Sequence, residues 1–241
     1  MIFAAGLGTR LRPLTNTMPK ALVKVNGMPL LEIIIRRLKW FGFNRIIINV
    51  HHFPKQIIQF LEEKQYFNTE IAVSDETDLL LDTGGGITKA AWFFDNNEPF
   101  LVHNVDILCD LNLADLYDFH RQNKSLATLA VKTREASRVF LFNEKMELCG
   151  WKNRQTKDTI ISKGREKDLT AIPFSGIHVI SPEIFDKITE TGVFSIVDVY
   201  LRLAKKHRII AYPHEKYRWM DVGRPEQLEK APEVLEKMEL G

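Results

Sequence analysis

The sequence lacks several features that define common classes of protein. It contains only two cysteines, Cys109 and Cys149, in 241 residues. They give neither a disulfide framework nor the CxxC spacing of a zinc site, so they favour a reduced, cytoplasmic setting. No apolar run reaches the length of a transmembrane helix, and the first residues lack the basic and apolar regions of a signal peptide.

Net charge is also small. The formal value is only +2, which is too weak to indicate a nucleic-acid or membrane partner. Hydrophobic residues make up 45% and charged residues 27%, as is usual for a globular chain. We therefore expect one domain over residues 1–241, acting as a monomer or a homodimer without a nucleic-acid or membrane partner. The chain opens almost directly on a strand-like segment, and such a strand usually has residues before it.

Strand-like and helix-like segments alternate through the first half of the chain. Strands separated by helices imply parallel βαβ units, so the pattern predicts an α/β fold with a doubly wound, mostly parallel sheet. Apolar spacing predicts helices over residues 29–41, 54–64, 84–94 and 113–122, and short apolar runs predict strands over 1–5, 45–50, 69–73, 100–105 and 126–131.

The pattern changes after Thr133, where short strand-like pieces predict a small added β region. A charged stretch, residues 152–168, indicates an exposed loop or hairpin. We expect residues 1–133 and 134–241 to form two halves of one domain. In the second half we predict strands over 139–142, 148–151, 176–180 and 209–212, and helices over 182–188, 196–206 and 225–238.

The most informative segment is AAGLGTRLRPLTNTMPKALVKV, residues 4–25. Gly6 and Gly8 follow a strand, where glycine permits a tight turn and lets backbone N–H groups approach an anion. Arg10, Arg12 and Lys20 add three cations suited to a polyphosphate. The dinucleotide pattern GxGxxG fails at position 11, and no Walker loop is present. A plain strand-to-loop turn is the alternative, and the length of the whole run disfavours it.

This segment resembles the signature of the sugar-1-phosphate nucleotidyltransferases, the NDP-sugar pyrophosphorylases. The resemblance extends over nearly the whole chain, through DTGGGITKA (82–90), HNVD (103–106), FSGIHVI (174–180) and WMDVG (219–223). It implies a Rossmann-like nucleotidyltransferase fold. It also implies a transferase of NDP-sugar biosynthesis that joins a nucleoside monophosphate from an NTP to a sugar 1-phosphate and releases pyrophosphate.

Substrate choice within the family is less defined by the sequence. The TGGGI run and the short C-terminus are most similar to members that use UTP and N-acetylmuramate 1-phosphate. Guanylyl or thymidylyl transfer to a hexose or heptose 1-phosphate is an alternative, as is cytidylyl transfer to phosphocholine. A catalytically inactive nucleotide-binding regulatory protein is an alternative of a different class.

Two aspartates are candidate metal ligands. Asp106 ends the apolar run LVHNVD, and Asp221 follows the aromatic run YRWM. Because the ends of parallel strands gather at one edge of a sheet, we expect the two carboxylates to meet there and to hold one Mg²⁺. The alternative is that each aspartate caps a turn or a helix. In the run Gly84 to Gly86, side chains are absent where a nucleobase would approach, and the alternative is a turn that opens a helix with Thr83 as its N-cap.

The resemblance distributes the remaining roles over the chain. The reaction needs no protein nucleophile, which agrees with the absence of a G-x-S-x-G elbow. The resemblance implies catalytic roles for Arg10 and Lys20, nucleotide contacts for Ala5, Gly6, Gly8, Thr9, Thr83, Gly84, Gly85 and Asn104, sugar contacts for Gly150, Ser175 and Gly176, and metal binding for Asp106 and Asp221.

Overall fold

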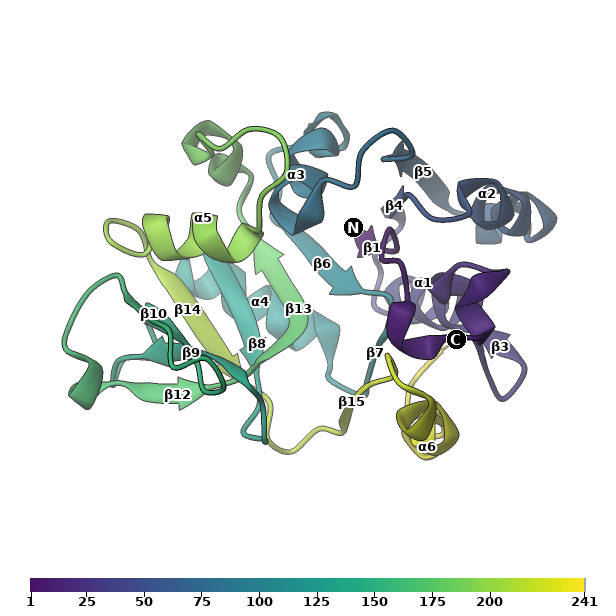
Figure 1. The fold of residues 1–241 in the computed structure, drawn as a ribbon. Coiled ribbons are helices and arrows are strands. Elements are labelled where there is room, and N and C mark those ends of the chain that lie inside the picture. The colour runs from purple at the N-terminus through teal and green to yellow at the C-terminus, as the bar shows by residue number, and fades with distance from the viewer. Residues whose placement is uncertain (241) are drawn as a thin grey trace. The chain divides into compact units, whose positions relative to one another are not determined.

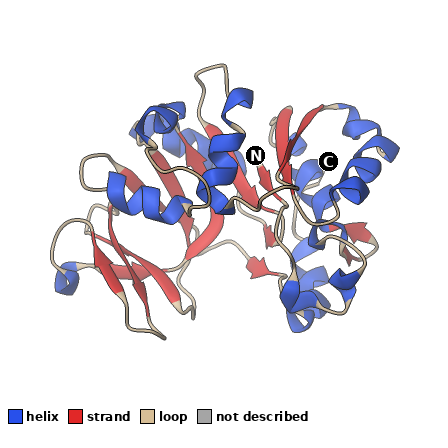
Figure 2. Cartoon of the chain, turned by 45° about the horizontal axis from the view of Figure 1, so that its top comes forward, coloured by secondary structure: helices blue, strands red, loops and turns tan. Residues whose placement is uncertain are grey.

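The computed structural model describes residues 1–240 (Figures 1 and 2). Its largest sheet has seven strands in the order β14-β8-β13-β6-β1-β4-β5. The pairs β6–β1, β1–β4, β4–β5 and β8–β14 are parallel, and β13 runs antiparallel to β8. The predicted α/β fold with a mostly parallel sheet is confirmed. Within the described residues, no helix has the length and apolar character needed to cross a membrane.

Contacts within the chain define two compact units. Unit 1 contains Met1–Leu81, His103–Leu113 and Tyr217–Gly241, and unit 2 contains Asp82–Val102 and Ala114–Lys216. Strand β6, Phe100–Asn104, contributes residues to both. Our expectation of one domain with halves 1–133 and 134–241 stays a prediction.

Unit 1 is built on parallel strands flanked by amphipathic helices. Strand β4, Arg45–Val50, is buried from its second residue onward and pairs with β1, Ile2–Phe3, and with β5, Glu70–Asp75. Helix α1, Leu30–Trp40, buries Ile34 and Leu38 on one face. Each such side chain contributes about 1.5–3 kcal/mol relative to an exposed one. Helix α2, Pro54–Glu63, begins at a proline, which suits the first turn.

Two short strand pairings in unit 1 were not among the predicted elements. Strands β2, Lys24–Val25, and β3, Met28–Pro29, form a hairpin. Strand β7, Ile107–Cys109, pairs antiparallel with β15, Trp219–Asp221, and helix α6, Pro225–Leu235, packs against both (Figure 1). Segments of two or three residues carry no periodic pattern, which is why the sequence did not indicate them.

Unit 2 holds the other strands of the large sheet. These are β8, Ala127–Val131, β13, Phe174–Ile180, and β14, Ile209–Pro213. Helix α4, Leu113–Asn123, lies behind β8 and β13 in the view of Figure 1. The remaining helices are α3, Asp82–Lys89, which packs against α5, and α5, Ile196–Leu203, whose N-cap Ser195 accepts a hydrogen bond from Val197 N–H.

A separate four-stranded antiparallel sheet forms the added β region of unit 2 (Figure 2). Residues 152–168 contain part of a hairpin between β10 and β11, in agreement with one of the two predicted forms. The sheet has the order β11-β10-β9-β12, with β9 at Arg138–Phe142, β10 at Leu148–Asn153, β11 at Thr159–Ile161 and β12 at Thr170–Ile172.

Several predicted bounds need correction. Strand β1 has only two residues, because the chain turns into a loop at Ala4. The segment predicted as helix 182–188 is a 3-10 helix, Pro182–Lys187. The helices predicted to reach residues 206 and 238 end at Leu203 and Leu235. Helix α3 begins at Asp82, before the three glycines, and a 3-10 turn, Ala91–Phe93, replaces its predicted end.

Candidate active site

The glycine-rich loop follows β1 directly, and its backbone is most tightly constrained at Gly8. Gly8 has φ 62°, in the left-handed region that glycine adopts without steric cost. A Cβ there would lie 2.9 Å from Thr15 Cγ2 and 3.1 Å from Lys20 Cβ. The Gly8 carbonyl accepts hydrogen bonds from Thr15 Oγ1 at 2.8 Å and from Leu11 N–H at 2.9 Å. A side chain at this position would therefore disrupt the turn.

The rest of the loop alternates between anchors and exposed residues. Leu11 and Thr15 are buried and hold the loop on unit 1. Gly6, Thr9 and Arg10 are exposed, while Ala5 is buried. The exposed part contains backbone, the cationic side chains of Arg10 and Arg12, and two apolar side chains, Leu7 and Leu14; its backbone and cations suit contact with a charged solute.

Lys20 and Asp106 form an ion pair inside unit 1. The Nζ of Lys20 donates to Asp106 Oδ2, and both side chains are largely shielded, with 10% and 18% of their surface exposed. A shielded pair is screened by salt much less than a surface pair. The structure thus joins two residues that lie 86 positions apart and that the sequence had assigned to phosphate and metal separately.

Arg10 and Asp221 form a second, more open pair. Arg10 Nη2 lies 3.5 Å from Asp221 Oδ2, and the two side chains are 50% and 35% exposed. Gly223 N–H donates to Asp221 Oδ1 at 2.8 Å. A Cβ on Gly223 would lie 2.5 Å from Arg10 Nη2 and 2.7 Å from Asp221 Oδ1. Gly223 has no predicted role, and the close approach of these atoms requires glycine at that position.

The antiparallel pairing of β7 with β15 brings the two aspartates together. Asp221 is opposite Ile107 in the ladder, and Val222 N–H donates to the Asp106 carbonyl at 2.9 Å. We expected the ends of parallel strands to do this, and that expectation was wrong, because β15 belongs to a two-stranded sheet of its own with β7. We predicted that the two aspartates lie near each other, but not that the β7–β15 pairing brings them there.

Strand β6 holds a buried basic group that stays neutral. Desolvation lowers the pKa of His103 to about 3, so its imidazole is uncharged at neutral pH. Its Nδ1 lies 2.8 Å from the carbonyl oxygen of Asn104, which fixes the Nδ1–H tautomer as the donor. His103 thus fixes the backbone at Asn104, two residues before Asp106.

The candidate nucleotide residues of unit 2 have partners of their own. Gly84 N–H and Gly85 N–H donate to the Phe194 carbonyl at 2.9 and 3.3 Å, and a Cβ on Gly84 would lie 2.4 Å from the Phe194 ring. Thr83 lies inside α3 and does not cap it. Its Oγ1 accepts from Ile196 N–H at 3.0 Å. Close packing of the chain around Phe194 therefore explains the glycine at position 84.

The candidate sugar residues also take part in the packing of unit 2. A Cβ on Gly150 would lie 2.4 Å from the Ile160 carbonyl oxygen, so the β10–β11 pair requires glycine there. Ser175 is buried, and its Oγ lies 2.7 Å from His214 Nε2. Gly176 has φ 75° and sits within the register shift of β13 between Phe174 and His178.

The two carboxylates suit a hard divalent cation, which prefers oxygen ligands. Within residues 1–240, no group of three or more His, Cys, Asp or Glu side chains could hold a metal ion. Asp106 and Asp221 both keep some exposed surface, so other ligands can reach them. A metal held here would take its remaining ligands from a substrate and from water.

Comparison with known proteins identifies the family. A model of the nucleotidyl transferase family matches residues 1–238. The chain belongs to this family. It is 31% identical to an N-acetylmuramate alpha-1-phosphate uridylyltransferase of Neisseria meningitidis, over 96% of this chain and 95% of that protein. The identity with a UTP–glucose-1-phosphate uridylyltransferase of Synechocystis is 28%, over 93% of this chain.

Several relatives are longer proteins, and solved structures agree on the fold. The chain spans about 60% of the length of the Synechocystis enzyme and of a mannose-1-phosphate guanyltransferase of Yarrowia lipolytica. A putative glucose-1-phosphate thymidylyltransferase of Bacillus anthracis has the same fold, with a TM-score of 0.80, 17% identity, and coverage of 100% of this chain and 96% of that chain. HddC of Yersinia pseudotuberculosis, complexed with GMP-PN, is 25% identical with a TM-score of 0.73 and 96% coverage of each chain.

Proposed function

We propose that this nucleotidyl transferase joins a nucleoside monophosphate from an NTP to a sugar 1-phosphate and releases pyrophosphate. The observation that carries the proposal is the pair of cation–carboxylate contacts on the glycine-rich loop, Lys20 with Asp106 and Arg10 with Asp221. Such a site offers cations for phosphate oxygens and carboxylates for a metal. The family of the chain and the names of its relatives support the same reaction class.

The chemistry asks the protein for position and charge. An oxygen of the sugar phosphate forms a bond to the α-phosphorus of the NTP. The bond from that phosphorus to the bridging oxygen breaks, and pyrophosphate leaves with the electron pair. Arg10 and Lys20 bind phosphate oxygens and stabilise the charge that develops there, and exposed backbone at Gly6 and Thr9 orients the triphosphate.

Asp106 and Asp221 would hold one divalent cation, which we propose to be Mg²⁺. When bound, such an ion neutralises negative charge on phosphate oxygens. The chain's contribution is to keep Asp106 and Asp221 next to each other through the β7–β15 pairing, and to pair them with Lys20 and Arg10. Asn104, fixed by His103, would contact the nucleotide as the sequence predicts.

The roles assigned in unit 2 remain proposals from the sequence. Thr83, Gly84 and Gly85 are proposed to lie near the nucleoside. The N–H groups of Gly84 and Gly85 donate to the Phe194 carbonyl, and the Gly84 carbonyl accepts from Thr88 Oγ1 at 3.1 Å, so a base would meet these glycines through the surface of their backbone. Gly150, Ser175 and Gly176 are proposed to lie near the sugar. The buried hydroxyl of Ser175 is engaged with His214, so a contact there would come from backbone.

For the substrates, we propose UTP and N-acetylmuramate 1-phosphate. The support is that two relatives named N-acetylmuramate alpha-1-phosphate uridylyltransferase are 31% and 30% identical to this chain. Guanylyl transfer is the second candidate, because HddC was solved with GMP-PN and several guanyltransferases of mannose 1-phosphate are among the relatives.

The test is a grid of the common NTPs against several sugar 1-phosphates with Mg²⁺, read by pyrophosphate release. We expect turnover, with UTP and N-acetylmuramate 1-phosphate as the fastest pair. A preference for GTP would replace the substrate assignment and leave the reaction class intact. If folded protein binds nucleotide and yet turns over no pair, the chain is a nucleotide-binding regulatory protein.

A further inference from the structure

Glu76 is a fully buried carboxylate whose partners are neutral. It follows β5 directly and has no exposed surface. Its Oε1 accepts from Asn49 Nδ2 at 2.8 Å, and its Oε2 accepts from Leu81 N–H at 3.1 Å. No cationic side chain of residues 1–240 forms an ion pair with it. Glutamate is rarely buried without such a partner, because the charged form loses its hydration.

Asn49 connects this carboxylate to the glycine-rich loop. It is buried in β4 and lies beside the end of β1, where it pairs with Phe3. Its Oδ1 accepts from Ala4 N–H at 2.8 Å. Since a carboxylate can only accept, the amide must present Nδ2 to Glu76 and therefore Oδ1 to Ala4. The charge of Glu76 thus fixes the orientation of the group that holds Ala4.

Glu76 is itself held by main-chain contacts. Its N–H donates to the Val50 carbonyl at 2.7 Å, and its carbonyl lies 2.6 Å from His51 Nδ1. Ala4 is the residue at which the chain leaves β1 and enters the loop that contains Gly6 and Gly8. A shift of Ala4 would be passed to that loop, because Ala5 is buried and Gly8 is closely packed.

We propose that Glu76, acting through Asn49, is a positioning residue that sets the entry of the glycine-rich loop and thereby its affinity for the NTP. The inference rests on the proposed function, in which this loop binds the triphosphate. Glu76 touches no substrate. Its effect is to keep the Ala4 backbone, and with it the phosphate-binding N–H groups beyond, in one orientation.

The hydrogen-bond pattern allows the carboxylate to be transferred from position 76 to position 49 by two substitutions. Glu76→Gln brings in an NH₂ group that meets another donor, either Leu81 N–H directly or Ala4 N–H after the Asn49 amide turns over. Asn49→Asp sets two carboxylates against each other. In the double variant, the new amide at position 76 accepts from Leu81 N–H and donates to the new carboxylate at position 49. That carboxylate also accepts from Ala4 N–H, so every donor regains an acceptor.

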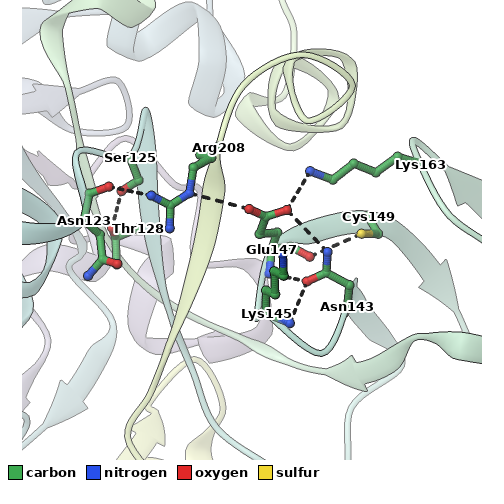
Figure 3. A network of polar contacts seen from close by, with 9 residues as sticks. All are labelled: Asn123, Ser125, Thr128, Asn143, Lys145, Glu147, Cys149, Lys163 and Arg208. Carbon is green, nitrogen blue, oxygen red and sulfur yellow. Dashed lines mark hydrogen bonds and ion pairs between the residues drawn. The ribbon is translucent and has the colours of Figure 1, made fainter.

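The experiment is a double-mutant cycle with three readouts: kcat and KM for the NTP, NTP affinity by calorimetry, and urea unfolding. We expect each single variant to raise KM and Kd for the NTP about tenfold or more, with a smaller change in kcat, and the double variant to recover most of the loss. Glu147→Gln is a matched change in the polar network of unit 2 (Figure 3), and it should leave kcat, KM and Kd for the NTP unchanged.

Three outcomes separate the possibilities. If the single variants only lower the unfolding midpoint, and the folded fraction binds NTP normally, Glu76 is structural and the inference is wrong. If the double variant binds NTP no better than the single variants, the proposed relay through Asn49 is wrong. If the wild type turns over no substrate pair, the proposed function fails, and loss and recovery of NTP binding still test the relay.

Discussion

Two groups of ion pairs in this chain are built from the same kinds of side chain and differ in the number of cations that each carboxylate receives. In the site of unit 1, Lys20 pairs with Asp106 and Arg10 with Asp221, one cation to one carboxylate. In unit 2, the single carboxylate of Glu147 receives Lys163 at 3.2 Å and Arg208 at 3.5 Å, and Asn143 Nδ2 donates to it at 3.3 Å (Figure 3). We call this second group the Glu147 network.

The difference lies in how fully each carboxylate is occupied. Glu147 is surrounded by three donors, and Arg208 is in turn tied to the Asn123 carbonyl at 2.8 Å. Such a network is complete without a ligand. Asp106 has one cationic partner, and the cations of the site come from the loop that follows β1. We therefore propose that the charges of this site are redirected to phosphate, and that the Glu147 network is a structural support.

Removing a site cation should have the largest effect. We expect Lys20→Ala and Arg10→Ala each to slow turnover by ~10²–10³, because each removes a preorganised charge contact with phosphate. The measurement is kcat at saturating NTP, with circular dichroism to show that the variant is folded. Lys163→Ala is the matched control, since it removes a lysine from the Glu147 network and should leave kcat unchanged. Normal turnover in both site variants would show that the loop is only structural.

The site carboxylates should behave as one unit. Asp106→Asn and Asp221→Asn keep the side-chain shape, and each removes one negatively charged ligand of the same metal ion. Their effects on rate should therefore not add. We expect either single variant to account for most of the loss seen in the double variant, and each to require more Mg²⁺. Turnover across titrated Mg²⁺ is the measurement. Two losses that multiply, or a normal Mg²⁺ dependence in either variant, would contradict a shared metal.

Removing the charge of Lys20 should raise the affinity for metal in the absence of nucleotide, although it lowers turnover. Because Lys20 forms an ion pair with Asp106, it competes with a metal cation for that carboxylate. We expect Lys20→Met to bind Mn²⁺ several-fold more tightly than the wild type when no nucleotide is present, although it is less active. Titration followed by electron paramagnetic resonance measures this directly. Weaker Mn²⁺ binding in the variant would mean that Lys20 organises the site without competing for it.

The sequence predicted best where a local pattern is long. The predicted bounds of β4, α2, α4 and β8 agree with the structure to within one residue, because the strands are continuous apolar runs and the helices have apolar residues at helical spacing. The loop glycines were also readable, since the left-handed turn at Gly8 requires glycine. Family membership followed from the same local runs and is confirmed by the match over residues 1–238.

What the sequence could not predict depends on contacts between distant segments. Nothing near Gly84 indicates that the Phe194 carbonyl takes its N–H, and nothing near Ser175 indicates His214. The β7–β15 pair joins segments more than a hundred residues apart, each three residues long. The buried position of Glu76 is hidden by the polar run SDETD around it.

The smallest expected effect is that of Glu147→Gln, and its pH dependence tests whether the Glu147 network is structural. Burial alone raises the pKa of Glu147, but hydrogen bonds from Lys163 and Asn143 and the charges of Lys163 and Arg208 outweigh it and lower that pKa below its usual value. A carboxyl with a lowered folded-state pKa adds stability above its unfolded pKa of about 4.3, and this is lost as pH falls through the folded value.

At pH 7 we therefore expect Glu147→Gln to lower the free energy of unfolding by about 1 kcal/mol or less, since the network is partly exposed. The difference from the wild type should stay constant above about pH 5 and shrink as the solution becomes more acidic. Urea unfolding at a series of pH values measures it, with kcat for the NTP reaction unchanged throughout. A difference that grows as pH falls would mean that the charge of Glu147 destabilises the fold, and a fall in kcat would place Glu147 among the residues that serve the reaction.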